Sequence, residues 1–241
     1  MSVMIGHASI DENGNGRNGQ AGDQTGKEVC TRSWWDKGWN VLLRPSEEYA
    51  EALAQACEAG CANNNIGYDM NQRNTLHTEA QKVGYDLSKI VTKCETDCSA
   101  FMTVCAIAAG ITALEYTGNA PTTSTMKNIF KATNKFAVLT NQDFLRNDKY
   151  VKRGDILVKE GSHTVMVLSN GDGVVTQAIP ADLQGKDIRV VSANALNVRV
   201  APMGSKLSVL SSKDRVNVLE EKDGWCRIEG WVSSQYLVKM K

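Results

Sequence analysis

The sequence predicts an α+β domain, in which helices pack on one face of a mostly antiparallel sheet, followed by a small all-β barrel. Helical patterns dominate before Tyr150, whereas short strands separated by turns follow it. After a linker at residues 180–186, apolar and polar residues alternate in short runs punctuated by glycine, as in a small barrel. We therefore expect a first domain over residues 1–185, with residues 1–45 as an N-terminal extension that lines it, and a second domain over residues 192–241.

Four segments of the first domain have helical patterns. They span residues 46–60, 71–83, 96–109 and 123–133. The third segment is apolar on nearly all sides, which indicates a buried helix. Thr96 or Asp97 can cap its N-terminus through a side-chain oxygen, and Gly110 can end it. Cys98 is therefore expected in the first turn of a rigid, buried helix.

Three strands are expected later in this domain, over residues 156–158, 163–168 and 174–179, with a Gly-Asp turn before the first. His163 opens the second of them. The second domain has alternating runs at residues 196–200, 216–219, 225–228 and 231–232. Because large aromatic side chains bury much apolar area, we expect Trp225, Trp231 and Tyr236 to form the core of the barrel.

The composition gives no support to several classes of function. The 27 basic and 27 acidic side chains give a formal net charge of +0, so nucleic-acid and anionic-membrane binding are not expected. The longest apolar run, over residues 104–114, is too short and too interrupted to span a bilayer. The first residues lack the basic region and the apolar stretch of a secretory signal, so we expect synthesis in the cytoplasm. We expect a monomer that inserts into no membrane.

The chain has seven cysteines, and this odd number without a signal peptide indicates free thiols made in a reducing compartment. Two pairs have the spacing of zinc ligands, Cys57 with Cys61 and Cys94 with Cys98. However, Cys57 lies in an amphipathic helix as a small core residue, and the closely paired knuckles of a structural zinc site are missing. We expect no metal and no cofactor.

Residues 11–26 are rich in Gly, Asn and Asp, which is the composition of loops and turns. Asp11, Asn13 and Asn15 resemble the first ligands of an EF-hand loop. The acidic residue expected at the end of such a loop is absent, so calcium is not expected.

Cys98 and His163 have the settings of a nucleophile and a general base. The positive end of a helix and a nearby imidazolium both favour the thiolate, which is the form that attacks a carbonyl. An imidazole at the start of a strand can take the thiol proton and return it to a leaving amine. His7 and His77 lack such a setting, and no catalytic role is expected for them.

A partner for the imidazole of His163 is expected on the strand that follows. If a three-residue loop joins the two strands, Gln177 faces Val165 on the same face of the sheet as His163; a tighter turn would bring Thr176 there instead. We favour Gln177 as the third catalytic residue, because its amide oxygen can accept a hydrogen bond from the imidazole. A residue of the N-terminal segment, such as Asp23, is the alternative.

Three segments resemble, in order and spacing, the NlpC-type papain-like cell-wall peptidases. They are Thr96-Asp-Cys-Ser-Ala-Phe101, Arg153-Gly-Asp-Ile-Leu157 and Ser162-His-Thr-Val-Met-Val-Leu168. Ala100 replaces the glycine usual in the family, and the resemblance covers about residues 85–180. It implies a papain-like fold in which Cys98 is the nucleophile and His163 the base.

The resemblance also implies residues that bind substrate. In the family, the acid that matches Asp97 helps to hold a free amino group of the peptidoglycan stem peptide, although an N-cap alone would also explain it. Ser99 is expected beside it in the substrate site. Asp23 and Trp35 lie outside the matched segments; they are expected to form a wall of the substrate groove, unless they serve only as loop structure and core aromatic.

The C-terminal segment resembles bacterial SH3-like domains, which commonly bind cell walls. The matching residues are Ala195-Leu-Asn-Val-Arg-Val-Ala-Pro202, Gly224-Trp-Cys-Arg-Ile228 and Gly230-Trp-Val-Ser-Ser-Gln-Tyr-Leu237. The two domains together resemble a phage endolysin, which accumulates in the cytoplasm and reaches the wall through a holin.

These resemblances imply a peptidoglycan hydrolase, an endolysin or autolysin, that acts through an acyl-enzyme. We expect a D-glutamyl endopeptidase, with an N-acetylmuramoyl-L-alanine amidase as the alternative using the same nucleophile. A non-catalytic protein that only binds the wall is the second alternative. The expected partner is the peptidoglycan of the bacterial cell wall.

Overall fold

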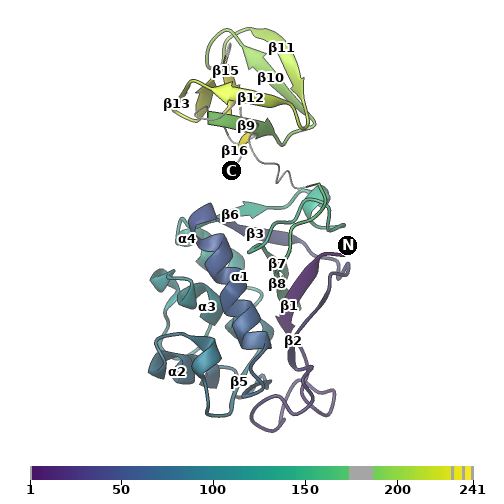
Figure 1. Ribbon diagram of the computed structural model, residues 1–241, viewed down its shortest axis with the longest axis vertical. Helices are drawn as coiled ribbons and strands as arrows, with labels where there is room; N and C mark the ends of the chain where they lie inside the picture. The colour runs from purple at the N-terminus through teal and green to yellow at the C-terminus, as the bar shows by residue number, and fades with distance from the viewer. Residues whose placement is uncertain (1, 174–186, 229–230, 235–236, 240–241) are drawn as a thin grey trace. The chain divides into compact units, whose positions relative to one another are not determined.

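The computed structural model describes residues 2–173, 187–228, 231–234 and 237–239 (Figure 1). The chain divides into two compact units, residues 1–174 and 175–241, each described by itself below. The strands of the first unit are β1 (Met4–Ala8), β2 (Val29–Ser33), β3 (Val41–Pro45), β4 (Ile66–Tyr68), β5 (Cys94–Thr96), β6 (Phe136–Leu139), β7 (Ile156–Lys159) and β8 (His163–Val167). Its helices are α1 (Glu47–Cys61), α2 (Thr75–Lys82), α3 (Cys98–Ala108) and α4 (Met126–Ala132), with short 3-10 turns at Leu87–Lys89, Thr112–Leu114 and Gln142–Phe144.

Six of these strands form one sheet in the order β2-β1-β8-β7-β3-β6, and every neighbouring pair is antiparallel. β4 and β5 form a separate parallel pair. The first 45 residues, expected as an extension that lines the domain, supply β1, β2 and β3 as integral strands of the sheet. As a result, β8 has β7 on one side and β1 on the other.

The helices gather on one side of this sheet, as Figure 1 shows. Leu53 of α1 and Phe101 of α3 pack there in one core with Leu43, Ile156 and Met166 of the sheet. The α+β class with an antiparallel sheet is confirmed, and each of the four helices overlaps its predicted range. The apolar surface of α3 explains its central place, because all of its residues from Cys98 to Ile107 are buried.

The opposite face of the sheet carries a second core. Side chains alternate along a strand, so Val165 faces this core, whereas Met166 faces the helices. Here the covering residues come from loops rather than helices, and they include Trp39, which is fully buried, and Leu145. The aromatic segment before β3 therefore closes the sheet beside the start of β8.

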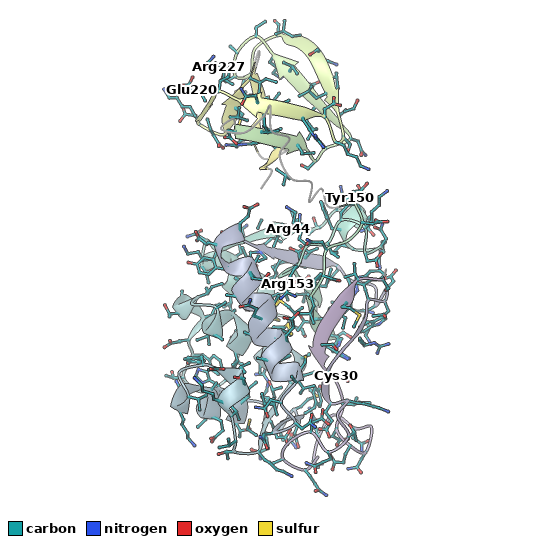
Figure 2. All side chains as sticks on the ribbon, in the orientation of Figure 1. Cys30, Arg44, Tyr150, Arg153, Glu220 and Arg227 are labelled. Carbon is teal, nitrogen blue, oxygen red and sulfur yellow. The ribbon has the colours of Figure 1, made fainter. Side chains whose placement is uncertain are left out.

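The predicted Gly-Asp turn joins three elements. Gly154 has a φ of +91°, and a Cβ there would lie 2.5 Å from the backbone oxygen of Ala50 in α1, so only glycine fits. Asp155 is fully buried and forms an ion pair of 2.7 Å with Arg44 of β3. Arg44 also donates to the backbone oxygen of Tyr150 (Figure 2). The turn thus ties β7 to β3 and α1, and its backbone hydrogen bonds with Val167 hold the end of β8.

The second unit is all β. Its strands are β9 (Asp187–Val191), β10 (Ala195–Arg199), β11 (Lys206–Ser211), β12 (Arg215–Val218), β13 (Glu220–Lys222), β14 (Trp225–Arg227), β15 (Trp231–Ser233) and β16 (Leu237–Lys239). They form a five-stranded sheet, β11-β10-β15-β14-β13, and a three-stranded sheet, β12-β9-β16. The expected all-β organisation of this region is confirmed, whereas the strand predicted over residues 174–179 lies outside the described residues.

The core of this unit differs from the prediction. Small apolar side chains fill it, namely Val191, Leu196, Val198, Val216, Val218, Cys226 and Val232. Cys226 pairs with Val232 across β14 and β15, so their side chains point inward and the neighbouring Trp225 points to the other face, where it is half-buried. The expectation that Trp225 lies in the core is therefore wrong, while the side chains of Trp231 and Tyr236 lie outside the described part of the structure.

Candidate active site

Cys98 is the first residue of α3, as predicted. The side chain of Asp97 caps the helix, because its Oδ1 accepts the N–H of Ala100 at 2.7 Å. β5 ends at Thr96 and leads directly into this cap. The Cys98 side chain is buried, with 6% of the residue exposed. Its position is therefore fixed from both sides, by a strand before it and a buried helix after it.

The structure brings Cys98 to the start of β8, where His163 lies. α3 and β8 are in contact, and the backbone N–H of Thr164, the residue after His163, acts to lower the pKa of Cys98, against the larger effect of burial. The N–H of Ser99 acts in the same sense. The start of β8, where His163 lies, is thus beside Cys98, although the two residues are far apart in the chain; the imidazole itself lies on the side of the sheet that carries Val165 and Trp39.

Aromatic rings hold the imidazole of His163. The ring of Trp39 stacks on it at 6.2 Å between centroids with an interplanar angle of 26°, and Trp35 lies 6.0 Å away. Trp39 is itself anchored, because its Nε1 donates to the backbone oxygen of Trp35 at 3.0 Å. Trp35, expected in the wall of a substrate groove, is half-buried and lies within this ring cluster, next to the candidate base.

The partner of the imidazole is His7. Its Nδ1 lies 3.4 Å from Nε2 of His163, and both rings are buried. The expectation that His7 has no special setting is wrong, since β1 pairs with β8 and carries His7 to His163. Gln177, the predicted third residue, lies outside the described residues, as does Thr176. The edge of β8 opposite β7, where a following strand was expected, is occupied by β1.

A chain of polar contacts sets the tautomers of the two histidines. Cys30 of β2, labelled in Figure 2, donates its thiol proton to the backbone oxygen of Lys27 at 3.3 Å. Its sulfur can then accept from Nε2 of His7 at 3.6 Å, which leaves Nδ1 of His7 as an acceptor. With this tautomer of His7, Nε2 of His163 is the donor to that nitrogen, and Nδ1 of His163 keeps its lone pair. The free lone pair is the one a general base needs.

Burial keeps this site neutral. Desolvation raises the pKa of the Cys98 thiol to about 12, and it lowers the pKa of His163 to about 4. The pKa of His7 is lowered to about 3, also by desolvation and then by the charge of His163. The sequence suggested a thiolate stabilised by an imidazolium; the structure instead favours a neutral thiol and a neutral imidazole, because both side chains are withdrawn from water.

Asp97 and Ser99, both expected to bind substrate, are engaged within the protein. Arg73 forms a two-pronged ion pair with Asp97, with its Nε 2.5 Å from Oδ2 and its Nη2 3.1 Å from Oδ1. Ser99 donates to Oδ1 of Asp97 and accepts from Arg73. The Asp97 carboxylate is thus neutralised internally, which supports its role as a cap. The sequence analysis missed Arg73, which carries no motif of its own.

Asp23 is buried and holds the loop before β2. Its two carboxylate oxygens accept the backbone N–H groups of Thr25, Gly26, Lys27, Glu28 and Val29. This places Asp23 as an organiser of the loop, and the structure offers no support for a role in substrate binding or as the partner of His163. Among the residues that the structure describes, no three His, Cys, Asp or Glu side chains are arranged to hold a metal ion, and the cysteines are free thiols.

The first domain is thus an α+β domain with a buried cysteine at the start of a helix and a buried histidine at the start of a strand. A small β domain accompanies it in the chain. The profile of the endolysin-like domain matches residues 5–174, and that of the bacterial SH3 domain matches residues 194–238. The chain belongs to the endolysin-like domain family, since the first match covers more than half of its length.

The two domains together indicate a peptidoglycan hydrolase that acts on the cell wall and binds it through the SH3 domain. Searches of curated proteins and of solved structures gave no significant match. Within the described residues, we find no helix with the length and hydrophobicity needed to cross a membrane.

Proposed function

We propose that this protein is a cysteine-type peptidoglycan hydrolase of the NlpC, papain-like kind, with Cys98 as nucleophile and His163 as base. The observation that carries the proposal is the position of the Cys98 thiol, at the start of α3 and against the first residues of β8. Residues 1–185 would form the catalytic domain and residues 192–241 the wall-binding domain. Synthesis in the cytoplasm and release through a phage holin belong to the same proposal.

In this proposal His7, and not Gln177, is the partner of the His163 imidazole. It faces His163 from β1, and its Nδ1 is positioned to accept the proton on Nε2 of His163. In this arrangement His7 is a positioning residue, which fixes the ring of the base and stabilises the imidazolium that forms during the reaction.

Acylation would begin when a stem-peptide carbonyl approaches Cys98. The sulfur forms a bond to the carbonyl carbon while Nδ1 of His163 takes the thiol proton, so a neutral pair becomes a charged one only as the bond forms. The N–H of Ala100 is taken by the Asp97 cap, so the backbone N–H groups of Cys98 and Ser99 at the start of α3 are those that can stabilise the oxyanion. His163 then gives its proton to the leaving amine, and a thioester remains on Cys98.

Deacylation reverses these roles. His163, neutral again, takes a proton from water, and the resulting hydroxide attacks the thioester carbon. The carbon–sulfur bond breaks, the thiolate regains the proton from His163, and a carboxylic acid is released. Trp35 and Trp39 support this cycle because they hold the imidazole in place and keep bulk water from its buried edge.

Among the stem-peptide bonds, we propose that the D-glutamyl bond is cut, as the resemblance to dipeptide-type endopeptidases implies. The test is mass spectrometry of purified walls digested with the full chain. Fragments that begin after D-glutamate support the endopeptidase, whereas intact stems with a free L-alanine terminus would show an N-acetylmuramoyl-L-alanine amidase instead. Soluble products that are equally abundant with Cys98→Ala would refute the cysteine mechanism and leave a wall-binding protein.

A further inference from the structure

The loop between β1 and β2 concentrates buried carboxylates at one end of the first unit. Five acidic residues of this loop and of the adjacent β4–β5 pair are each less than 9% exposed: Asp11, Asp23, Glu28, Asp69 and Glu95. None of them forms an ion pair with a described residue. Buried carboxylates are normally paired with cations or bound to metals, because an isolated buried charge is costly.

Asp11 shows an unused acceptor most clearly. Its Oδ1 accepts the backbone N–H groups of Asn13 at 2.9 Å and of Asn15 at 2.7 Å. Its Oδ2 is buried and has no hydrogen-bond partner among the described residues, although Asp11 is only 4% exposed. The carboxylate is therefore held by one oxygen, while the other is buried without a hydrogen-bond donor among the described residues.

Gly19 packs against the side chains of both Asp11 and Glu12. A Cβ on Gly19 would lie 3.3 Å from Oδ2 of Asp11 and 3.0 Å from Oε2 of Glu12. The N–H of Gly19 donates to Oδ2 of Asp69 at 3.1 Å. Asp11, Glu12 and Asp69 thus each contact Gly19, although the three carboxylates are not arranged to hold one ion directly.

We propose that this loop binds a calcium ion. Oδ2 of Asp11 and the carboxylate of Glu12 would be its charged ligands, with the exposed amide side chains of Asn13 and Asn15 completing the oxygen set. The Glu12 oxygens already accept the N–H of Gln20, and one accepts from Nδ2 of Asn13, which holds this carboxylate in the loop. Asp69 would lie behind them as a further negative charge, held through Gly19.

Calcium fits because it takes six to eight oxygen ligands in a flexible geometry, and the run from Asp11 to Gly16 has the Asp-x-Asn-x-Asn-Gly order of a calcium loop. The sequence argued against calcium because the loop has no acidic residue at its end. In the fold, Asp69, which follows β4, lies beside the loop and supplies a negative charge in place of that missing acidic residue.

The ion would stabilise the chain segment that leads to Cys98. Gly16 of the loop accepts the N–H of Met70, and the N–H of Asp69 donates to Thr96, each at 3.0 Å. Thr96 ends β5 and directly precedes the cap of α3. Calcium is therefore expected to stabilise the segment that places Cys98, without touching the reacting atoms.

Binding is tested directly on the full chain with terbium, whose luminescence nearby aromatic rings such as Tyr68 can sensitise, followed by displacement with Ca²⁺ or Mg²⁺. Asp11→Asn keeps an oxygen for the backbone N–H groups but removes the charge, and Glu12→Gln is a milder second variant that leaves the loop contacts of Asp11 intact. Asp143→Asn, at an exposed acid far along the chain, is the matched control.

We expect one saturable terbium site per chain, displaced by Ca²⁺ at about tenfold lower concentration than by Mg²⁺. Both loop variants should weaken terbium binding by about tenfold or more, while Asp143→Asn leaves it unchanged. Absence of saturable binding, equal displacement by the two cations, or unchanged binding in a Glu12→Gln protein with native circular dichroism would each overturn the proposal. These measurements do not depend on hydrolysis, so the calcium proposal and the catalytic proposal can fail independently of each other.

Discussion

Two buried polar clusters of the first unit differ in whether their groups are charged and whether those groups have partners. Around His163, desolvation suppresses charge, and each imidazole nitrogen that faces a neighbour has a partner or a lone pair with a defined use. Around Gly19, carboxylates are buried without an ion pair among the described residues, and an oxygen of Asp11 is left without a partner. The first cluster is complete within the chain, whereas the second is complete only with a cation. The comparison shows that burial alone does not identify a catalytic site, because the state of the buried groups decides their use.

Removal of the nucleophile should have the largest effect on the neutral cluster. Cys98→Ala is expected to lower the rate of wall hydrolysis by about 10³-fold or more, because no acyl-enzyme can form. The measurement is release of soluble fragments from purified walls, with co-sedimentation showing that wall binding is retained. Cys94→Ala, which removes another buried thiol, at the start of β5, is the control and should keep most activity. Comparable loss in both variants would contradict the assignment of Cys98.

Substitutions can decide whether His7 or Gln177 is the partner of the His163 imidazole. His7→Ala should lower kcat roughly 10²-fold, since the imidazole of His163 would lose the acceptor that fixes its tautomer. His7→Asn should recover part of this loss, because its amide oxygen can accept the same proton. Gln177→Ala is expected to leave kcat within a few-fold of the wild type. A large loss in Gln177→Ala together with a mild one in His7→Ala would return the role to Gln177.

A fall in pH should lower the free energy of unfolding, because His163 and His7 are buried in their neutral forms. Burial lowers the pKa of His163 to about 4 and that of His7 to about 3, below the usual value of 6.5, so the unfolded chain takes up these protons first as the pH falls. The stabilisation is complete above pH 6.5 and is lost as the pH falls towards 4 and then 3. For His163 this amounts to about 3 kcal/mol of unfolding free energy.

Urea unfolding of the full chain across this pH range measures the effect. His7→Asn removes one of the two groups, so its unfolding free energy should fall less steeply with acid than that of the wild type. An identical slope in the variant would show that His7 is not buried in its neutral form.

The smallest expected effect concerns Cys30, at the outer end of the chain of contacts. Cys30→Ala removes one acceptor from His7, which costs about one weak hydrogen bond, so kcat should fall by about two- to fivefold. Cys30→Ser should restore most of the rate, since a hydroxyl can accept from Nε2 of His7 and donate to Lys27 in turn. A rise in rate in Cys30→Ala would contradict the order of donors derived above.

Local signals in the sequence were sufficient for much of this structure. The cap at Asp97, the apolar run after it and the strand that His163 opens were all predicted, because each rests on residues a few positions apart. Trp225 was misplaced for a local reason as well: its alternation with Cys226 was clear, but the inward face could not be chosen without the opposing strand.

By itself, the sequence determined the helices and the short strands, since propensity and capping act over short distances. Only the tertiary structure decided that β1 lies beside β8, and with it the choice of His7 as the partner of His163. The same holds for Arg73 at Asp97 and for Asp69 at Gly19, which meet across long stretches of chain. Contacts of this kind depend on how strands order themselves in a sheet, and no spacing in a single sequence records that order.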